Sequence, residues 1–167
     1  MMNEIFNRAS VRVFKNTPVE KEKIEALLKA AMQAPSAGNQ QPWEFIVVEN
    51  KEMLEKLSET DAYAKFVAKV PGAIVLLGNT HEMRFPEHWE QDLSAAAENV
   101  LLEAVSQGLG AVWLGVAPLE ARMAHVTKIF DLPEHIKPFC IIPFGYAKKP
   151  YEVESRYDAD RVHYETY

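Results

Sequence analysis

Cysteine is almost absent from this sequence of 167 residues, in which Cys140 is the single example. One cysteine excludes an intramolecular disulfide and a cysteine-rich zinc site. Because Cys140 lies in the apolar run over residues 138–142, we expect a buried, unreactive thiol rather than a nucleophile.

Long apolar runs and an excess of basic residues are also missing. No apolar stretch reaches the length of a membrane span, and the first residues lack the apolar core of a signal peptide. We therefore expect a cytoplasmic protein with no membrane partner. The 18 basic residues are outnumbered by 24 acidic ones and form no stripe, which argues against binding to nucleic acid.

The residues that are present indicate one domain of mixed structure. The length fits a single domain over residues 1–167, with residues 148–167 as a charged, aromatic C-terminal tail. Thr17, Pro18 and Glu20 form a typical helix start, with Thr17 as the N-cap. Hydrophobic periodicity predicts helices at 3–7, 18–33, 51–58, 60–70, 92–107 and 118–130, and strands at 43–48, 73–77, 110–115 and 139–144. The expected fold class is α+β, with helices on both faces of a sheet.

A polar and aromatic loop, residues 78–90, separates the second strand from the longest helix. A loop of this length in a compact domain is often a lid or a substrate wall. It contains His81, Glu82 and His88, but their spacing fits no zinc pattern. We therefore expect exposed residues or substrate contacts here and no metal.

Arg8, Ser10 and Arg12 alternate near the N-terminus. In an extended segment they share one face. Two guanidinium groups and a hydroxyl directed to one point would bind a phosphate well. The alternative is a solvated surface that carries two unrelated arginines.

The stretch over residues 35–43 (PSAGNQQPW) joins a helix to a strand and is more polar than this connection requires. Gly38 permits a close approach to the backbone, and the uncharged side chains around it both donate and accept hydrogen bonds. This set suits a neutral heterocycle such as the flavin pyrimidine ring. The alternative is an ordinary turn, because proline, glycine, serine and asparagine are common turn residues.

Together these segments resemble the FMN-dependent nitroreductase family. The alternating Arg8, Ser10 and Arg12 are similar to its N-terminal phosphate motif, and residues 35–43 to its second motif. The helix at 92–107 with the following residues 108–115 (GLGAVWLG) resembles the third, and Gly145, Tyr146 and the later Arg156 resemble the fourth. The resemblance covers essentially the whole chain, in order.

The resemblance implies a nitroreductase-like sandwich, in which helices flank a central, mostly antiparallel sheet, built as an intertwined homodimer with FMN at the subunit interface. Arg8, Ser10 and Arg12 would hold the phosphate and ribityl chain, and Arg156, or alternatively Arg161, would add a phosphate contact. The remaining residues implied in cofactor binding are Pro35, Ser36, Ala37 and Asn39, which would come from the neighbouring subunit, and Leu114 and Gly115, whose N–H groups would meet flavin N5 and O4. The C-terminal tail would wrap over the partner; the alternative is a frayed terminus.

The implied activity is transfer of hydride from NAD(P)H through flavin N5 to a nitroaromatic, a quinone or a similar small acceptor, by a ping-pong mechanism. No catalytic side chain is expected, because the flavin carries the chemistry. The chain is short for the family, which leaves other readings open. These are an FMN-binding redox module without significant NAD(P)H turnover, a reduced-flavin enzyme of another reaction type, and a structural dimer that has lost the cofactor.

Overall fold

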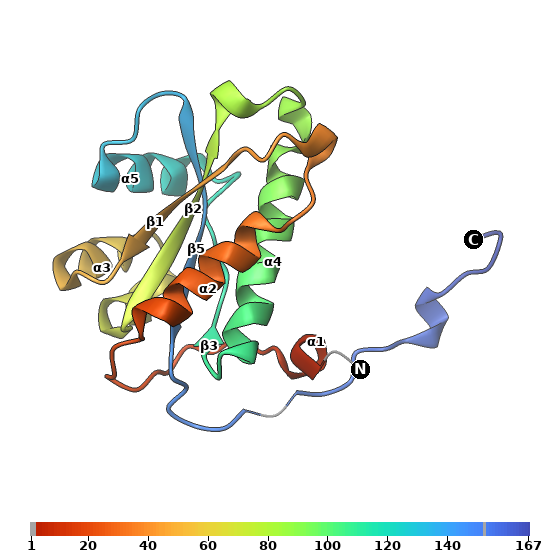
Figure 1. The fold of residues 1–167 in the computed structure, drawn as a ribbon, viewed down its shortest axis with the longest axis horizontal. Helices are drawn as coiled ribbons and strands as arrows, with labels where there is room; N and C mark the ends of the chain where they lie inside the picture. Colours follow the sequence, from red (N-terminus) through yellow and green to blue (C-terminus); the bar gives the residue numbers. More distant parts are fainter. Residues whose placement is uncertain (1–2, 152) are drawn as a thin grey trace.

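A five-stranded sheet, in which each pair of strands is antiparallel, forms the centre of the molecule (Figure 1). The computed structural model describes residues 3–151 and 153–167. The strands are β1 (Trp43–Val48), β2 (Gly72–Asn79), β3 (Gly110–Ala111), β4 (Leu114–Gly115) and β5 (Ile136–Gly145). Their order is β1-β2-β5-β3, and β4 also pairs with β5. The predicted strands at 43–48, 73–77 and 139–144 are confirmed.

The predicted strand at 110–115 is wrong in one respect, because it is divided into β3 and β4. The register does not change across the break: Ala111 lies opposite Phe144, and Leu114 lies opposite Ile141. Val112 donates its N–H to the carbonyl of Pro143 at 3.2 Å, but proline has no N–H to donate in return. The ladder is therefore interrupted at this point.

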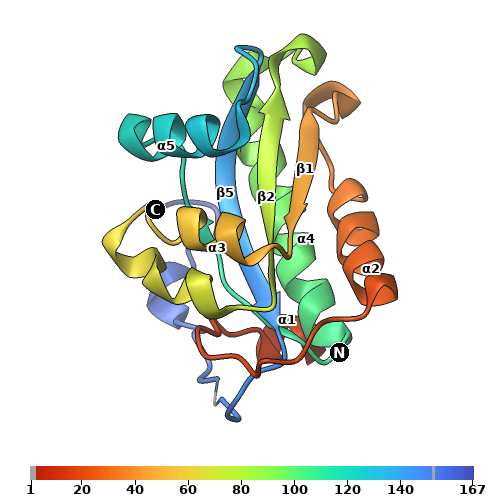
Figure 2. The same cartoon turned by 90° about the vertical axis from the view of Figure 1, so that its left-hand side faces the viewer.

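Helices cover both faces of the sheet (Figures 1 and 2). One face carries α2 (Lys21–Met32) and α4 (Trp89–Ser106), with α1 (Asn3–Asn7) against the end of α4. The other face carries α3 (Lys51–Leu57), the 3₁₀ segment η2 (Ala62–Lys69) and α5 (Glu120–Phe130). The α+β prediction, with helices on both faces, is confirmed.

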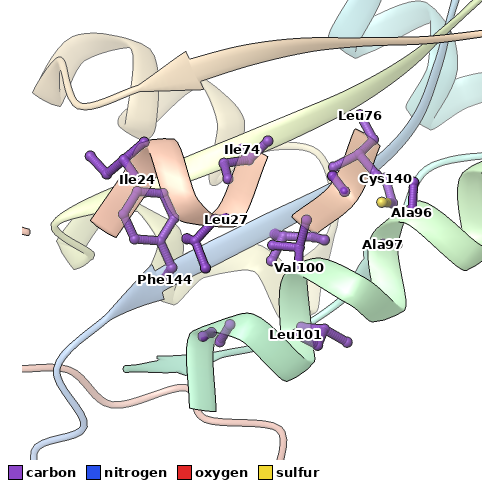
Figure 3. Close-up of a cluster of buried hydrophobic side chains, with 14 of the residues drawn as sticks. Ile24, Leu27, Ile74, Leu76, Ala96, Ala97, Val100, Leu101, Cys140 and Phe144 are labelled. Atoms are coloured by element: carbon purple, nitrogen blue, oxygen red, sulfur yellow. The ribbon is translucent and has the colours of Figure 1, made fainter. Parts of the chain in front are cut away.

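Alternate residues of β2 fill two cores, one on each face of the sheet. Ile74 and Leu76 pack with α2 and α4, whereas Val75 and Leu77 pack with α3, η2 and α5, as the two-residue period of a strand requires. Figure 3 shows the first core, which also contains Cys140. The thiol is fully buried, and burial raises its pKa well above the ordinary value. The prediction of a buried thiol is confirmed.

The predicted start of the helix at 18–33 is wrong. The helix begins at Lys21 after Glu20, which is extended and forms no side-chain cap. The Glu20 carboxylate instead accepts a hydrogen bond of 2.6 Å from the Tyr146 hydroxyl, which lowers the pKa of Glu20. The same hydroxyl accepts a hydrogen bond from Lys23 Nζ at 3.0 Å, which raises the pKa of Lys23. This contact across the fold replaces the expected capping box.

Three other boundaries also differ from the predictions. The segment at 60–70 is the 3₁₀ helix η2, and α5 begins at Glu120 rather than at Pro118. The loop at 78–90 is shorter than expected, because β2 extends to Asn79 and α4 begins at Trp89. Two 3₁₀ turns, η3 (Thr80–Glu82) and η4 (Pro86–His88), occupy the interval. Pro86 stands at the start of η4, where its fixed φ favours a helical turn.

The C-terminal tail extends away from the domain (Figure 1). In its described residues, 148–151 and 153–167, the regular structure is one 3₁₀ turn, η5 (Ala159–Arg161). Tyr157, Tyr164 and Tyr167 are exposed, and the ring of Tyr167 lies against that of His163 in the same tail, with centroids 4.4 Å apart. No helix in residues 3–151 and 153–167 is long and apolar enough to cross a membrane.

Candidate functional site

The N-terminal segment that carries Arg8, Ser10 and Arg12 lies along β3, in an extended conformation. Ser10 forms a parallel bridge with Ala111, and Val11 donates its N–H to the Ala111 carbonyl at 3.0 Å. Val11 is buried while Ser10 and Arg12 are exposed, so side chains alternate over residues 10–12. Arg8 is half-buried, and its N–H donates to the Glu4 carbonyl of α1 at 2.9 Å. A Cβ at Gly110 would lie 2.8 Å from the Val11 side chain, so glycine allows the segment to lie this close to β3.

Arg8 and Arg156 line the same cavity of about 440 Å³. Its walls are residues 5 and 6 of α1 and residues 153–157 of the tail. Arg8 Nε lies 3.8 Å from a Glu98 carboxylate oxygen, and the Glu98 side chain is 48% exposed. A long, solvated ion pair of this kind is weak, so Arg8 remains available to an anionic ligand.

Arg161 lies apart from these residues. Its Nε forms an ion pair of 3.0 Å with Asp158, three residues earlier in the exposed tail. Of the two arginines proposed for a further phosphate contact, Arg156 is therefore the one that the structure places beside Arg8.

The free edge of β4 continues from β3 on the same side of the sheet. Val112 and Val116 donate their N–H groups to the carbonyls of Pro143 and Phe139 in β5. Because backbone groups alternate in direction along a strand, Leu114 directs its N–H toward β5 and Gly115 directs its N–H away from it. The register thus favours Gly115 over Leu114 as the residue whose N–H meets a ligand.

Gly115 is held from the side by Arg122 of α5. Arg122 Nη1 donates to the Gly115 carbonyl at 2.8 Å, and its Nη2 forms an ion pair with Asp61. A Cβ at Gly115 would have no heavy atom of the described chain within 4 Å. The Gly115 peptide is therefore fixed while the space beside it is open.

The polar loop over residues 35–43 contains a 3₁₀ turn, η1 (Ala37–Asn39), and several left-handed residues. Gly38, Asn39 and Gln41 have φ values of 55°, 55° and 49°, and this conformation is unfavourable for residues other than glycine. Ser36 Oγ accepts a hydrogen bond from the Gln41 N–H at 3.0 Å, which closes the turn. Pro35 and Asn39 are exposed, and Ser36 and Ala37 are half-buried, so this loop can present polar groups to another molecule.

Two buried polar residues, Asp92 and Gln40, hold the loop in place. The sequence predictions did not include Asp92, and they counted Gln40 among the uncharged loop side chains available to a heterocycle. Asp92 Oδ1 accepts from the Ala37 N–H at 2.8 Å, and Oδ2 accepts from Gln40 Nε2 at 2.6 Å. Gln40 Oε1 in turn accepts from the Phe85 N–H at 2.8 Å. A signal for this contact exists in the sequence, because Asp92 lies on the same helical stripe as the buried residues Ala96 and Val100.

The predicted site residues thus form two groups in one chain. The loop with η1 lies beside the first turn of α4, whereas α1 and β3 lie beside its last turns (Figure 1). In residues 3–151 and 153–167, no hydrogen bond or ion pair joins residues 35–41 to residues 8–12, 114, 115 or 156. One group comprises Arg8, Ser10, Arg12, Leu114, Gly115 and Arg156, and the other comprises Pro35, Ser36, Ala37 and Asn39.

The two histidines of the connecting loop that were considered as metal ligands have other surroundings. The ring of His81 stacks on that of His135 with centroids 4.2 Å apart, and His88 Nδ1 lies 2.8 Å from the Gln91 side-chain oxygen. Within the part of the chain that the structure describes, no three histidine, cysteine, aspartate or glutamate side chains are grouped to hold a metal ion.

Comparison with known proteins gives matches over nearly the whole chain. Residues 5–70 and 58–146 match the Nitroreductase family. A protein of Archaeoglobus fulgidus, provisionally named NADH dehydrogenase/NAD(P)H nitroreductase, is 44% identical over 165 residues, which cover 96% of this chain and 95% of the relative.

Solved structures agree closely with this fold. A protein of Clostridium acetobutylicum, provisionally named an NADH oxidase, has a TM-score of 0.96 at 53% identity, with 98% of this chain and 99% of the other covered. An FMN-dependent nitroreductase of Clostridium difficile R20291 has a TM-score of 0.92 at 31% identity, with 100% of each chain covered.

Proposed function

The chain belongs to the nitroreductase family, and from this premise we propose that it is an FMN-dependent oxidoreductase that uses NAD(P)H and acts as a homodimer. The relatives are named for NAD(P)H-linked reduction, and one similar structure is named for its dependence on FMN. These names support the class of reaction. The acceptor, the kinetic mechanism and the roles of individual residues are argued from the site.

The single observation that carries the proposal is the edge formed by the N-terminal segment, β3 and β4. At one end of this edge lie Ser10, Arg12 and the cavity shared by Arg8 and Arg156. At the other end lies Gly115, with open space beside it. The strand rise from Ala111 to Gly115 separates the two ends by about 13 Å.

The chemistry of these groups fits a flavin mononucleotide. Guanidinium groups bind phosphate oxygens through charge-assisted, directional hydrogen bonds, and the exposed Ser10 hydroxyl adds a neutral donor. The Gly115 N–H would donate to the edge of the isoalloxazine ring, with Leu114 lining the same edge. Arg8, Arg12 and Arg156 would hold the phosphate.

A second copy of the chain would complete the site. The loop with Pro35, Ser36, Ala37 and Asn39 presents polar groups, but within the described residues it forms no hydrogen bond to β4 of its own chain. In a homodimer, the loop of one subunit would contact the cofactor held by the other. The exposed tyrosines of residues 148–167 would pack on the partner, which would remove their aromatic surface from water.

When bound, FMN supplies the hydride-accepting and hydride-donating chemistry. The chain's own residues would bind and orient it. The Gly115 N–H would donate to the edge of the ring, where negative charge develops on reduction, and the arginines would balance the constant charge of the phosphate. No side-chain acid or base is required for this role. The open space at Gly115 would admit NAD(P)H and a small aromatic acceptor in turn, which predicts ping-pong kinetics.

Steady-state initial rates test this mechanism directly. NADH or NADPH is varied at several fixed concentrations of a quinone or a nitroaromatic compound. Parallel double-reciprocal lines are expected, because the first product leaves before the acceptor binds. Intersecting lines, which require both substrates bound together, would contradict the proposal.

The phosphate contacts are tested by FMN titration of arginine variants. Arg12→Ala and Arg156→Ala should each weaken FMN binding by about 1.5–3 kcal/mol, the contribution of a hydrogen bond to a charged group. Arg161→Ala is the matched control, since this residue pairs with Asp158 in the tail. A loss of affinity in the Arg161 variant together with none in the Arg156 variant would reverse the assignment.

A further inference from the structure

Asp92 and Gln40 form a buried polar clamp that joins three segments of the chain. Asp92 is 4% exposed and Gln40 is 8% exposed. The clamp connects the first turn of α4 to the polar loop and to Phe85, which precedes η4. We propose that Asp92 is a positioning residue of the flavin site, which fixes the loop of one subunit in the conformation that contacts the FMN held by the other.

The hydrogen bonds of the clamp have defined directions. The Asp92 carboxylate only accepts, and it receives the Ala37 N–H and Gln40 Nε2 on different oxygens, at 2.8 and 2.6 Å. Gln40 both accepts from the Phe85 N–H at 2.8 Å and donates to the Phe85 carbonyl at 3.1 Å. The acceptor at Asp92 therefore fixes the orientation of the Gln40 amide, and Gln40 fixes Phe85.

The loop needs such support because its backbone is unfavourable without it. Two of its three left-handed residues, Asn39 and Gln41, carry side chains. A conformation of this kind persists only when surrounding contacts impose it. Arg84 adds a further contact by donating to the Gly38 carbonyl at 2.8 Å. The contacts hold the backbone and leave Pro35 and Asn39 exposed.

This inference rests on the proposed function, because it assigns the loop a cofactor-binding role in trans. If only the ordered loop binds FMN, the apparent dissociation constant rises as the ordered fraction falls. Asp92→Asn keeps an acceptor for the Ala37 N–H but places an amide N–H₂ against Gln40 Nε2. One buried group then lacks a partner, which shifts a conformational equilibrium by roughly five- to 150-fold.

The first experiment measures FMN affinity in purified, full-length variants. Asp92→Asn should raise the dissociation constant for FMN severalfold, up to the roughly 150-fold limit of that shift. Gln40→Glu alone should also weaken binding, because it would place two carboxylates in contact. The double variant should recover much of the lost affinity, since its introduced glutamate can accept from the introduced amide.

Glu90→Gln is the matched control, because it removes the same charge from the same turn of α4. Its FMN affinity should match that of the wild type. If Asp92→Asn does not fold, Gln40→Ala replaces it, and the same loss of affinity is expected. A wild-type dissociation constant in Asp92→Asn, or in Gln40→Ala if that is the variant used, would overturn the inference.

The second experiment tests action across the interface, with a readout that a loss of stability alone does not produce. Arg12→Ala and Asp92→Asn chains are co-expressed with different affinity tags, and the mixed dimer is isolated through both tags. One of its two sites then has Arg12 from the Asp92→Asn chain and an intact loop from the Arg12→Ala chain. It should bind FMN with wild-type affinity at half of the wild-type stoichiometry, although each parent homodimer binds weakly.

If the loop served the site of its own chain, both sites of the mixed dimer would be defective and no wild-type affinity would return. That result would overturn the inference and the placement of the loop at the partner's site, while leaving the proposed FMN-dependent oxidoreductase activity intact. A wild-type protein that binds no FMN would instead contradict the proposed function itself. The two failures are therefore distinguishable.

Discussion

The contact between Arg122 and Gly115 allows the sharpest test of how the scaffold shapes the site. Arg122 joins three elements, because it donates to the Gly115 carbonyl of β4 at 2.8 Å and pairs with Asp61 at the start of η2. Asp61 also accepts from the Tyr63 N–H at 2.5 Å. Arg122→Met removes the guanidinium and keeps an extended side chain of similar reach.

The size of the effect follows from these contacts. Each hydrogen bond to a charged group contributes about 1.5–3 kcal/mol, and Arg122 makes two such contacts. The Arg122 and Asp61 side chains are 28% and 15% exposed, so water compensates part of the loss. We expect the free energy of unfolding to fall by about 2–4 kcal/mol. For a chain of this length the midpoint of thermal unfolding then falls by about 4–16 °C.

Urea unfolding of the FMN-free protein measures the change, in Arg122→Met, Asp61→Asn and the double variant. The double variant should be less destabilised than the sum of the two single variants, because each single change leaves a charged or polar group without its partner. FMN affinity should also fall in Arg122→Met, since the Gly115 peptide loses its lateral support. A destabilisation below about 0.5 kcal/mol with unchanged FMN affinity would refute this reasoning.

Gly115→Ala should leave the thermal midpoint unchanged, because the added Cβ enters open space, and it should weaken FMN binding, because that space is the proposed cofactor site. Gly110→Ala should instead lower the thermal midpoint, because the added Cβ would lie 2.8 Å from the Val11 side chain. If Gly115→Ala bound FMN with the wild-type affinity, the β4 edge at Gly115 would not be part of the cofactor site. In Tyr146→Phe the pKa of Glu20 should rise toward its ordinary value, as NMR titration can show, because the phenol hydrogen bond lowers it. The stabilisation from a lowered carboxyl pKa is present at neutral pH and is lost as pH falls through that pKa, so the difference in stability between wild type and variant should narrow at acid pH, where the hydrogen bond from Lys23 to the Tyr146 hydroxyl remains. Cys140 should react with a thiol reagent only in the denatured protein, because burial raises its pKa and covers it; rapid labelling of the native protein would contradict this.

The sequence predicted the fold class because its strongest signals are those that burial imposes. The strand at 73–77 is entirely apolar, the strand at 43–48 is aromatic and β-branched apart from Glu44, and both are present. Boundaries were predicted less well, because long-range contacts decide them. Glu20 has the right spacing for a capping box, but Tyr146 binds its carboxylate from a distant part of the chain. Local sequence cannot show that competition.

The candidate site was predictable only in part, for a similar reason. The alternation of Arg8, Ser10 and Arg12 is a local pattern, and the structure places Ser10 and Val11 of this segment against β3. The clamp between Asp92 and Gln40 joins residues 52 positions apart, and no local spacing connects them. Pairing on β5 likewise distinguishes Gly115 from Leu114, since both belong to one uniform apolar segment of the sequence.

The most direct test of the central claim is a visible absorption spectrum of the purified protein, followed by identification of the released flavin and anaerobic titration with NADH or NADPH. We expect a yellow protein that releases about one FMN per chain and loses its visible absorbance on addition of the reduced nicotinamide. A colourless protein that takes up no added FMN would contradict the account, and so would a bound flavin that neither nucleotide reduces.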